Sequence, residues 1–183
     1  SGTSIEYFPS YICTGQENQE LASGFKIGQR FHSAEAQRTA DGRIQHLGHL
    51  VKADGRWRLF VFGGEQTPTD TSSDAYKLID FLANDAASPA VKYTPQGADI
   101  DSVIDTYAIF QQQDLSMHDL HKYLWPAKGK YGLHDYEKVF QSQLGNDIYD
   151  LRGVDRTKGC VVVVRPDQHI AAILPVDAHG ELA

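Results

Sequence analysis

Cysteine and serine are the first residue types to test for chemistry, because they supply most covalent nucleophiles. The two cysteines, Cys13 and Cys160, lie far apart and belong to no CxxC or metal-type spacing, so the sequence indicates neither a disulfide scaffold nor a zinc site. Cys160 leads a run of valines, and we expect it to be a small buried hydrophobe. No serine lies in a GxSxG motif, and no cysteine has an evident activating partner. This use of cysteine favours a reducing cytoplasm.

Histidines gather in the stretch SMHDLHKYLWP. His118 and His121 are three residues apart, which would place them on one face of a helix, with Asp119 beside them and His134 further along. A metal site needs a third ligand that the spacing does not supply. We therefore interpret the stretch as a surface helical turn anchored by apolar side chains, namely Leu120, Leu124 and Trp125.

Carboxylates and glycines give no stronger signal. The pairs Asp99 with Asp101 and Asp147 with Asp150 lie in polar loops or a helix first turn, where solvated charge or capping explains them. No GxGxxG or GxxxxGK[ST] follows a predicted strand, and Gly63-Gly64 lacks the spacing. A nucleotide site in this chain is not expected.

Bulk properties narrow the class of partner. The chain has 183 residues, is 41% hydrophobic and carries a net charge of −7. No run of lysine or arginine could follow a phosphate backbone, and no apolar run reaches the length of a membrane span. Neither nucleic acid nor a membrane is expected as a partner. The opening SGTSIEYFPS has no initiator Met and no signal-type region, so we expect a piece of something longer.

The elements that must position these residues are clearest in the middle of the chain. Residues 56–64, RWRLFVFGG, form a short and nearly continuous apolar run that predicts a buried strand. Residues 72–85 show apolar side chains at helical spacing behind a serine cap and an acidic first turn. Residues 102–111 are β-branched and aromatic, so the unit is β-α-β with parallel strands.

The rest of the chain contains a less regular connection and then a hairpin. Residues 146–153 predict a short helical turn, with Asn146 as its cap and Gly153 as its end. In residues 158–175, KGCVVVVRPDQHIAAILP, two apolar runs flank Pro166 and Asp167, which predicts a β-hairpin. We assign residues 51–183 to one domain and residues 1–50 to an irregular, strand-containing lead-in from a preceding domain.

This order of elements is that of a thioredoxin-like α/β domain. A working thioredoxin needs a low-pKa cysteine in a CxxC at the start of the first helix of the unit. Here the loop reads GGEQTPTDTSS and contains no cysteine. The sequence therefore predicts a thioredoxin-like fold that does no thiol chemistry.

Four stretches also carry a family likeness: GFKIGQR at 24–30, DGRWRLFVFGG at 54–64, KGKYGLHDYEKVF at 128–140 and GCVVVVRPDQHIA at 159–171. In this order they resemble the C-terminal domain of the phenol hydroxylase family of FAD-dependent aromatic monooxygenases. The resemblance implies a non-catalytic domain that dimerises and covers the flavin and substrate domains of the parent. It implies FAD and NADPH for the parent, whose flavin and substrate residues lie upstream. No catalytic, cofactor or metal residue is therefore assigned to this chain.

The chain departs from the family at three places, one of which is a short connection between Phe140 and Gly153. Gln168 stands where the family commonly has glycine after Arg-Pro-Asp, so the turn is expected to differ in type. The sequence stops where the family normally continues into a closing aromatic helix, which predicts apolar sheet surface left uncovered.

A second interpretation stays open. A stand-alone protein of the same fold could bind a small aromatic molecule, or catalyse a non-redox step on one. His118, His121, Tyr123 and Trp125 would then be the residues involved, as a cluster of acid-base and stacking groups.

Overall fold

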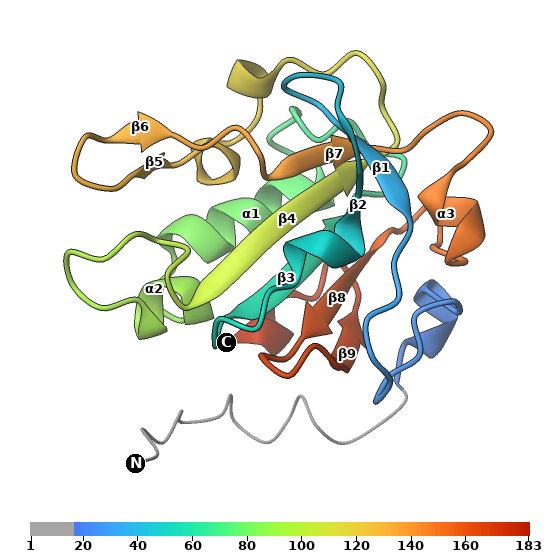
Figure 1. The fold of residues 1–183 in the computed structure, drawn as a ribbon, viewed down its shortest axis with the longest axis horizontal. Coiled ribbons are helices and arrows are strands. Elements are labelled where there is room, and N and C mark those ends of the chain that lie inside the picture. The colour runs from blue at the N-terminus through green and yellow to red at the C-terminus, as the bar shows by residue number, and fades with distance from the viewer. Residues whose placement is uncertain (1–16) are drawn as a thin grey trace.

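The computed structural model describes residues 17–183, so Cys13 and the segment SGTSIEYFPS lie outside the described residues. The chain builds a seven-stranded mixed sheet in the order β2-β1-β7-β4-β3-β8-β9, and a separate hairpin of β5 and β6 (Figure 1). The strands are β1 (Glu35–Arg38), β2 (Ile44–His46), β3 (Trp57–Phe62), β4 (Ile104–Phe110), β5 (Ala127–Lys128), β6 (Leu133–His134), β7 (Val139–Gln141), β8 (Cys160–Val164) and β9 (Ile170–Leu174). The α-helices are α1 (Asp74–Asn84), α2 (Pro89–Tyr93) and α3 (Ile148–Leu151). Short 3-10 helices are η2 (Gln19–Leu21), η3 (Leu47–Leu50), η4 (Met117–Asp119), η5 (Lys122–Leu124) and η6 (His179–Leu182).

The predicted β-α-β unit forms the centre of the sheet. β3 and β4 are parallel neighbours, in a register that runs from Trp57 opposite Ile104 to Phe62 opposite Ile109. Every residue of β3 is buried, because both faces of the strand are covered. The expected crossover between these strands is confirmed, with α1 and α2 between them along the chain.

Helix α1 begins where the sequence predicts. Ser73 is its N-cap, and its hydroxyl accepts a hydrogen bond from the amide of Tyr76. The buried face of the helix consists of Ala75, Leu78, Ile79, Phe81 and Leu82. The helix ends at Asn84, and the stretch after it contains α2 with a proline in its first turn.

The predicted C-terminal hairpin is confirmed, and its turn shows what Gln168 does there. β8 pairs antiparallel with β3 and with β9, and a register shift lies at Val163/Val164. Gln168 has φ of 70°, a left-handed conformation that completes a turn with a bulge. Its side chain bonds to Arg30 and, at 3.0 Å, to the carbonyl of Val51. Gln168 thus adopts a backbone conformation that favours glycine, and its side chain ties the turn to residues 17–51.

The region before the hairpin is more regular than the sequence suggests. Residues 127–141 contain β5, β6 and β7, and β7 pairs parallel to β4. β1 pairs antiparallel with β7 and with β2, so strands from residues 17–50 complete the sheet. The division of the chain at residue 51 stays a prediction. The short helix is capped by Asp147 rather than Asn146, because the carboxylate of Asp147 accepts the amide of Tyr149 at 2.9 Å.

Two apolar cores lie on the two faces of the sheet. One contains α1 and residues such as Leu59, Val61 and Ala108, and the other contains Phe60, Phe62 and Ile109. All residues of β8 and β9 are buried. The expectation of uncovered apolar surface is therefore wrong for this hairpin, because residues 17–31 and the C-terminal η6 contribute side chains to the two cores.

Candidate functional site

The four residues suspected from the sequence lie around one open groove, which we call the α1 groove. Its volume is about 590 Å³. It lies between α1 and the segment of η4 and η5, and its lining is Tyr76, Ala83, Asn84, Ile100, Asp119, Leu120 and Lys122 together with His118, His121, Tyr123 and Trp125. The sequence thus locates a real concavity, although the pattern is two 3-10 turns rather than one helical turn.

Hydrogen bonds inside the α1 groove engage the groups that could act as acid or base. Nδ1 of His121 accepts the amide of Tyr123 at 3.1 Å, and its Nε2 lies 3.1 Å from the carboxylate of Asp80. The hydroxyl of Tyr123 is 2.9 Å from that of Thr106, and burial raises the pKa of Tyr123 far above its ordinary value. His121 therefore joins η5 to α1, and Tyr123 stays protonated.

A cluster of four rings adjoins the groove at the base of the β5–β6 hairpin. The Trp125 ring lies 5.1 Å from His118 and 5.2 Å from His134, and stacks on Tyr136 at 6.4 Å. Nε2 of His118 is 3.0 Å from the Tyr136 hydroxyl. Within residues 17–183, no group of three His, Cys, Asp or Glu side chains is placed to hold a metal ion. These rings pack the base of the hairpin.

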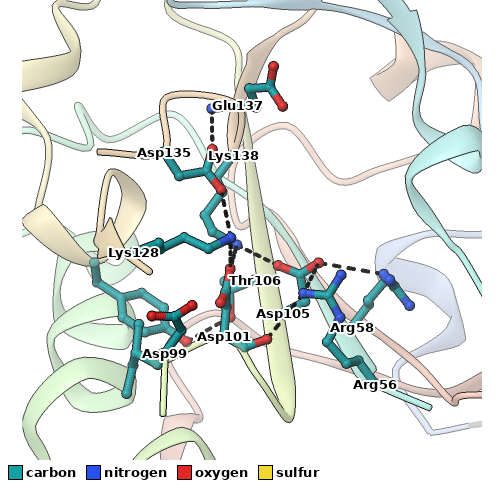
Figure 2. Close-up of polar contacts among 12 residues, drawn as sticks. Arg56, Arg58, Asp99, Asp101, Asp105, Thr106, Lys128, Asp135, Glu137 and Lys138 are labelled. Carbon is teal, nitrogen blue, oxygen red and sulfur yellow. Dashed lines mark hydrogen bonds and ion pairs between the residues drawn. The ribbon is translucent and has the colours of Figure 1, made fainter. Parts of the chain in front are cut away.

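A buried ionic cluster lies beside this base (Figure 2). Nζ of Lys138 is 2.5 Å from Asp105 and 2.9 Å from Asp101. Asp105 also faces Arg56 at 3.5 Å and Arg58 at 3.6 Å. The side chains of Arg58 and Asp105 are each 1% exposed. These are charges that only mutual pairing makes tolerable in a protein interior.

The cluster neutralises itself. Its outer members extend it to Asp54, paired with Arg56 and Arg58, and to Lys128, which lies 2.7 Å from Asp101 and 3.1 Å from Asp135. The carboxylates are Asp54, Asp101, Asp105 and Asp135, and the cations are Arg56, Arg58, Lys128 and Lys138. Equal numbers of each sign leave no surplus charge for a ligand, so the cluster is structural.

Proton affinities follow from these contacts. Burial disfavours the charged form of Asp101, yet the charges of Lys138 and Lys128 outweigh it and lower the pKa of Asp101. Burial likewise opposes ionisation of Asp54, but hydrogen bonds from Arg58 and Arg56 outweigh it and hold the pKa of Asp54 far below its ordinary value. Both carboxylates are therefore ionised at neutral pH.

Sequence reasoning missed this cluster. The interpretation of Asp101 as a solvated charge is wrong, because Asp101 is 4% exposed and ion-paired. A signal did exist: Arg58 and Asp105 are charges inside two apolar predicted strands that were expected to be parallel neighbours, and the structure pairs them in register. Of the two roles allowed for Asp147, solvated charge or capping, the structure shows capping.

The loop between β3 and α1, where a thioredoxin has its cysteines, begins with two glycines that pack closely against neighbouring groups. A Cβ added to Gly64 would lie 2.3 Å from the carbonyl of Thr157, and one added to Gly159 would lie 2.1 Å from that of Phe62. The Tyr149 hydroxyl donates to the carbonyls of Gly63 at 2.6 Å and Ile109 at 3.0 Å. Since these glycines serve close backbone contacts, they form no open cradle for the phosphates of a flavin, and this region does not fit FAD.

The fold shows to which structural class the domain belongs. The chain is a thioredoxin-like α/β domain, similar to a thioredoxin-like protein from Bacteroides caccae at 14% identity, with a TM-score of 0.53 over 88% of this chain and 49% of that one. In the described part of the chain the cysteine is Cys160, which is free and buried, and burial raises the pKa of its thiol far above the ordinary value.

The family follows from the sequence comparisons. The family model described as "Phenol hydroxylase, C-terminal dimerisation domain" matches residues 5–183, and the chain belongs to this family. It is 46% identical to 3-hydroxybenzoate 4-monooxygenase of Comamonas testosteroni, over 100% of this chain and 29% of that protein. It is 30% identical to the FAD-dependent monooxygenase terD of Aspergillus terreus, over 98% of this chain and 30% of that protein.

The chain therefore spans less than a third of the length of these curated relatives. Among residues 17–183, no helix is long and apolar enough to cross a lipid bilayer.

Proposed function

We propose that this chain is the non-catalytic C-terminal domain of a flavin-dependent aromatic hydroxylase, where it joins two copies of the enzyme and covers the flavin and substrate domains. The observation that carries the proposal is the 46% identity to 3-hydroxybenzoate 4-monooxygenase over the whole of this chain. The parent would use FAD and NADPH to hydroxylate a phenolic ring, and the cofactor would supply that chemistry. A cytoplasmic enzyme suits a domain whose buried Cys160 is unpaired.

The interactions that the domain's polar groups already make support this role. Its buried charges pair with one another, and its glycines at the ends of β3 and β8 pack against backbone. These groups are occupied within the domain, which supports a contribution to catalysis through assembly and exclusion of solvent.

The test is sedimentation equilibrium of the chain together with a flavin-binding assay. We expect a homodimer, and a colourless protein after incubation with FAD and desalting. A yellow complex that survives desalting would contradict the non-catalytic role, and a monomer at every concentration would contradict dimerisation.

The alternative, a stand-alone domain that binds a small aromatic, has one observation in its favour: His118, His121, Tyr123 and Trp125 do line a single groove. Titration with phenol and with 3-hydroxybenzoate, followed by the fluorescence of Trp125, tests it. Saturable quenching that is lost in a Trp57-only variant, made by Trp125→Phe, would support the alternative over the proposal.

A further inference from the structure

We propose that the β5–β6 hairpin, residues 127–134, is an arm through which two copies of this chain associate, each placing its tip in the α1 groove of the other. The inference rests on the proposed dimerisation and names the surface that performs it. Figure 1 shows the hairpin projecting from the body of the domain, apart from the main sheet.

The tip of the arm exposes apolar side chains. Tyr131 is 81% exposed and Leu133 is 73% exposed. Single exposed hydrophobics are normal on a protein surface, but here two lie within three residues of each other on one short hairpin. Gly129 and Gly132 adopt positive φ, and the amide of Gly132 bonds to the carbonyl of Gly129, so the tip is a defined turn.

The base of the arm is braced on both sides. On one side, Lys128 bridges Asp101 and Asp135, and the amide of Gly129 donates to Asp99 at 3.0 Å. On the other side, the Trp125 ring contacts the rings of His118 and His134. An exposed apolar tip on a rigid support loses little conformational freedom on binding, as a docking element requires.

Charge complementarity identifies the α1 groove as the surface that receives the tip of the arm. Lys130, at the tip, lies 5.6 Å over the Tyr131 ring and has no carboxylate partner among residues 17–183. Asp119, exposed in the α1 groove, has no cationic partner among the same residues. The groove also offers Tyr76 and Trp125 as ring surfaces for Tyr131. Tip and groove are thus complementary in charge and in apolar character.

Position argues for a second copy as the occupant. Trp125 belongs both to the base of the arm and to the wall of the α1 groove, so the two surfaces adjoin. A two-fold axis beside them makes both contacts at once, because in an isologous interface a residue and its counterpart exchange roles. A partner of different sequence would have no need of this adjacency, and the family is described as a dimerisation domain.

A charge exchange measured by sedimentation equilibrium on the full chain tests the pairing. Lys130→Glu and Asp119→Lys should each raise the dimer Kd about 10-fold or more, because each places like charges together twice per dimer. Mixing these two variants should restore a 1:1 heterodimer with Kd near the wild-type value, since every reversed charge then faces an opposite one. Lys26→Glu, an exposed lysine in the segment before β1, is the matched control and should leave Kd unchanged.

The apolar contact is tested in the same way. Tyr131→Ser should raise Kd about 30-fold, the effect of removing an interface anchor. Leu144→Ser removes a side chain that is 91% exposed on the segment between β7 and α3, and should have no effect. Circular dichroism of each variant confirms that it is folded.

The outcomes separate this inference from the proposed function. If the wild-type chain is a dimer and none of the arm and groove variants changes its Kd, the arm does not form the dimer contact, although dimerisation itself stands. The arm would then bind something else, such as a preceding domain. Single variants that weaken the dimer but do not recombine overturn the pairing of Lys130 with Asp119. A wild-type monomer overturns both proposals.

Discussion

Removal of the ammonium group of Lys138 tests whether the ionic cluster holds the sheet together. This group is the only cation within 3 Å of Asp105 among the contacts described, at 2.5 Å, and it also reaches Asp101 at 2.9 Å. Lys138→Met keeps the length of the side chain and deletes its charge. Asp105 is then left in the interior with two guanidinium groups at 3.5 and 3.6 Å.

The expected loss follows from that geometry. Breaking a buried ion pair by removing one partner costs about 3–5 kcal/mol, because the other charge stays buried without compensation. Here Arg56 and Arg58 compensate in part, and Lys128 still pairs with Asp101. We therefore expect a decrease of about 3 kcal/mol in the free energy of unfolding, at the lower end of that range.

The assay is urea unfolding at one fixed protein concentration, since a dimer's stability depends on concentration. Lys26→Met is the control and should change the free energy of unfolding by less than about 0.5 kcal/mol. In a double-mutant cycle, Asp105→Asn should lose much less stability in the Lys138→Met background than in the wild type. A loss below about 1 kcal/mol for Lys138→Met, or additive losses in the cycle, would refute the role assigned to the pair.

Four further outcomes are expected. Tyr149→Phe removes both hydrogen bonds of a buried hydroxyl and should lower the free energy of unfolding by about 1–2 kcal/mol in the same urea assay; an unchanged midpoint would contradict this. Gln168→Ala should be less stable than Gln168→Gly by about 1 kcal/mol, because both lose the side-chain bonds but only alanine keeps the cost of positive φ; equal stabilities would show that the turn is unstrained. In a Cys13→Ser background, Cys160 should react with a thiol reagent only after unfolding, because the thiol is fully buried, and rapid labelling of the native protein would refute that burial. The free energy of unfolding should also fall as the pH drops below about 4, because the pKa of Asp101 is lower in the folded chain than in the unfolded one and protonation removes the difference.

The sequence predicts the centre of the fold well because that part is locally determined. β3, α1, β4 and the β8–β9 hairpin each show their own periodicity, cap or turn residues, and each is confirmed within a few residues. β5, β6 and β7 are two or three residues long. Such short strands carry no periodic signal, and long-range pairing with β1 and β4 defines β7.

The candidate site likewise has one part that could be predicted from the sequence and one part that could not. The His118 to Trp125 stretch was predictable as a group, because its residues are close in the chain and share one groove. The ionic cluster was not, since Lys138 and Asp105 are 33 residues apart and only the parallel pairing of β7 with β4 brings them together. An arginine in an apolar run indicates a buried charge, and the predicted pairing of β3 with β4 points to Asp105 as its partner, but Lys138 can be named only once β7 is placed beside β4.

The first turn of α1 shows how this fold keeps its architecture without thiol chemistry. A helix N-terminus lowers the pKa of a cysteine placed there, because its free amides and dipole stabilise the thiolate. In this chain the amide of Asp74 donates to Oε1 of Gln66 at 2.8 Å, and that of Tyr76 donates to the hydroxyl of Ser73. Neutral oxygens of the chain therefore take the position that a thiolate would occupy, and the helix is stabilised without a reactive group. A cysteine introduced by Ser73→Cys would lose this cap, and within residues 17–183 the other thiol is the buried Cys160, so the loop itself would have to supply a resolving cysteine for redox activity.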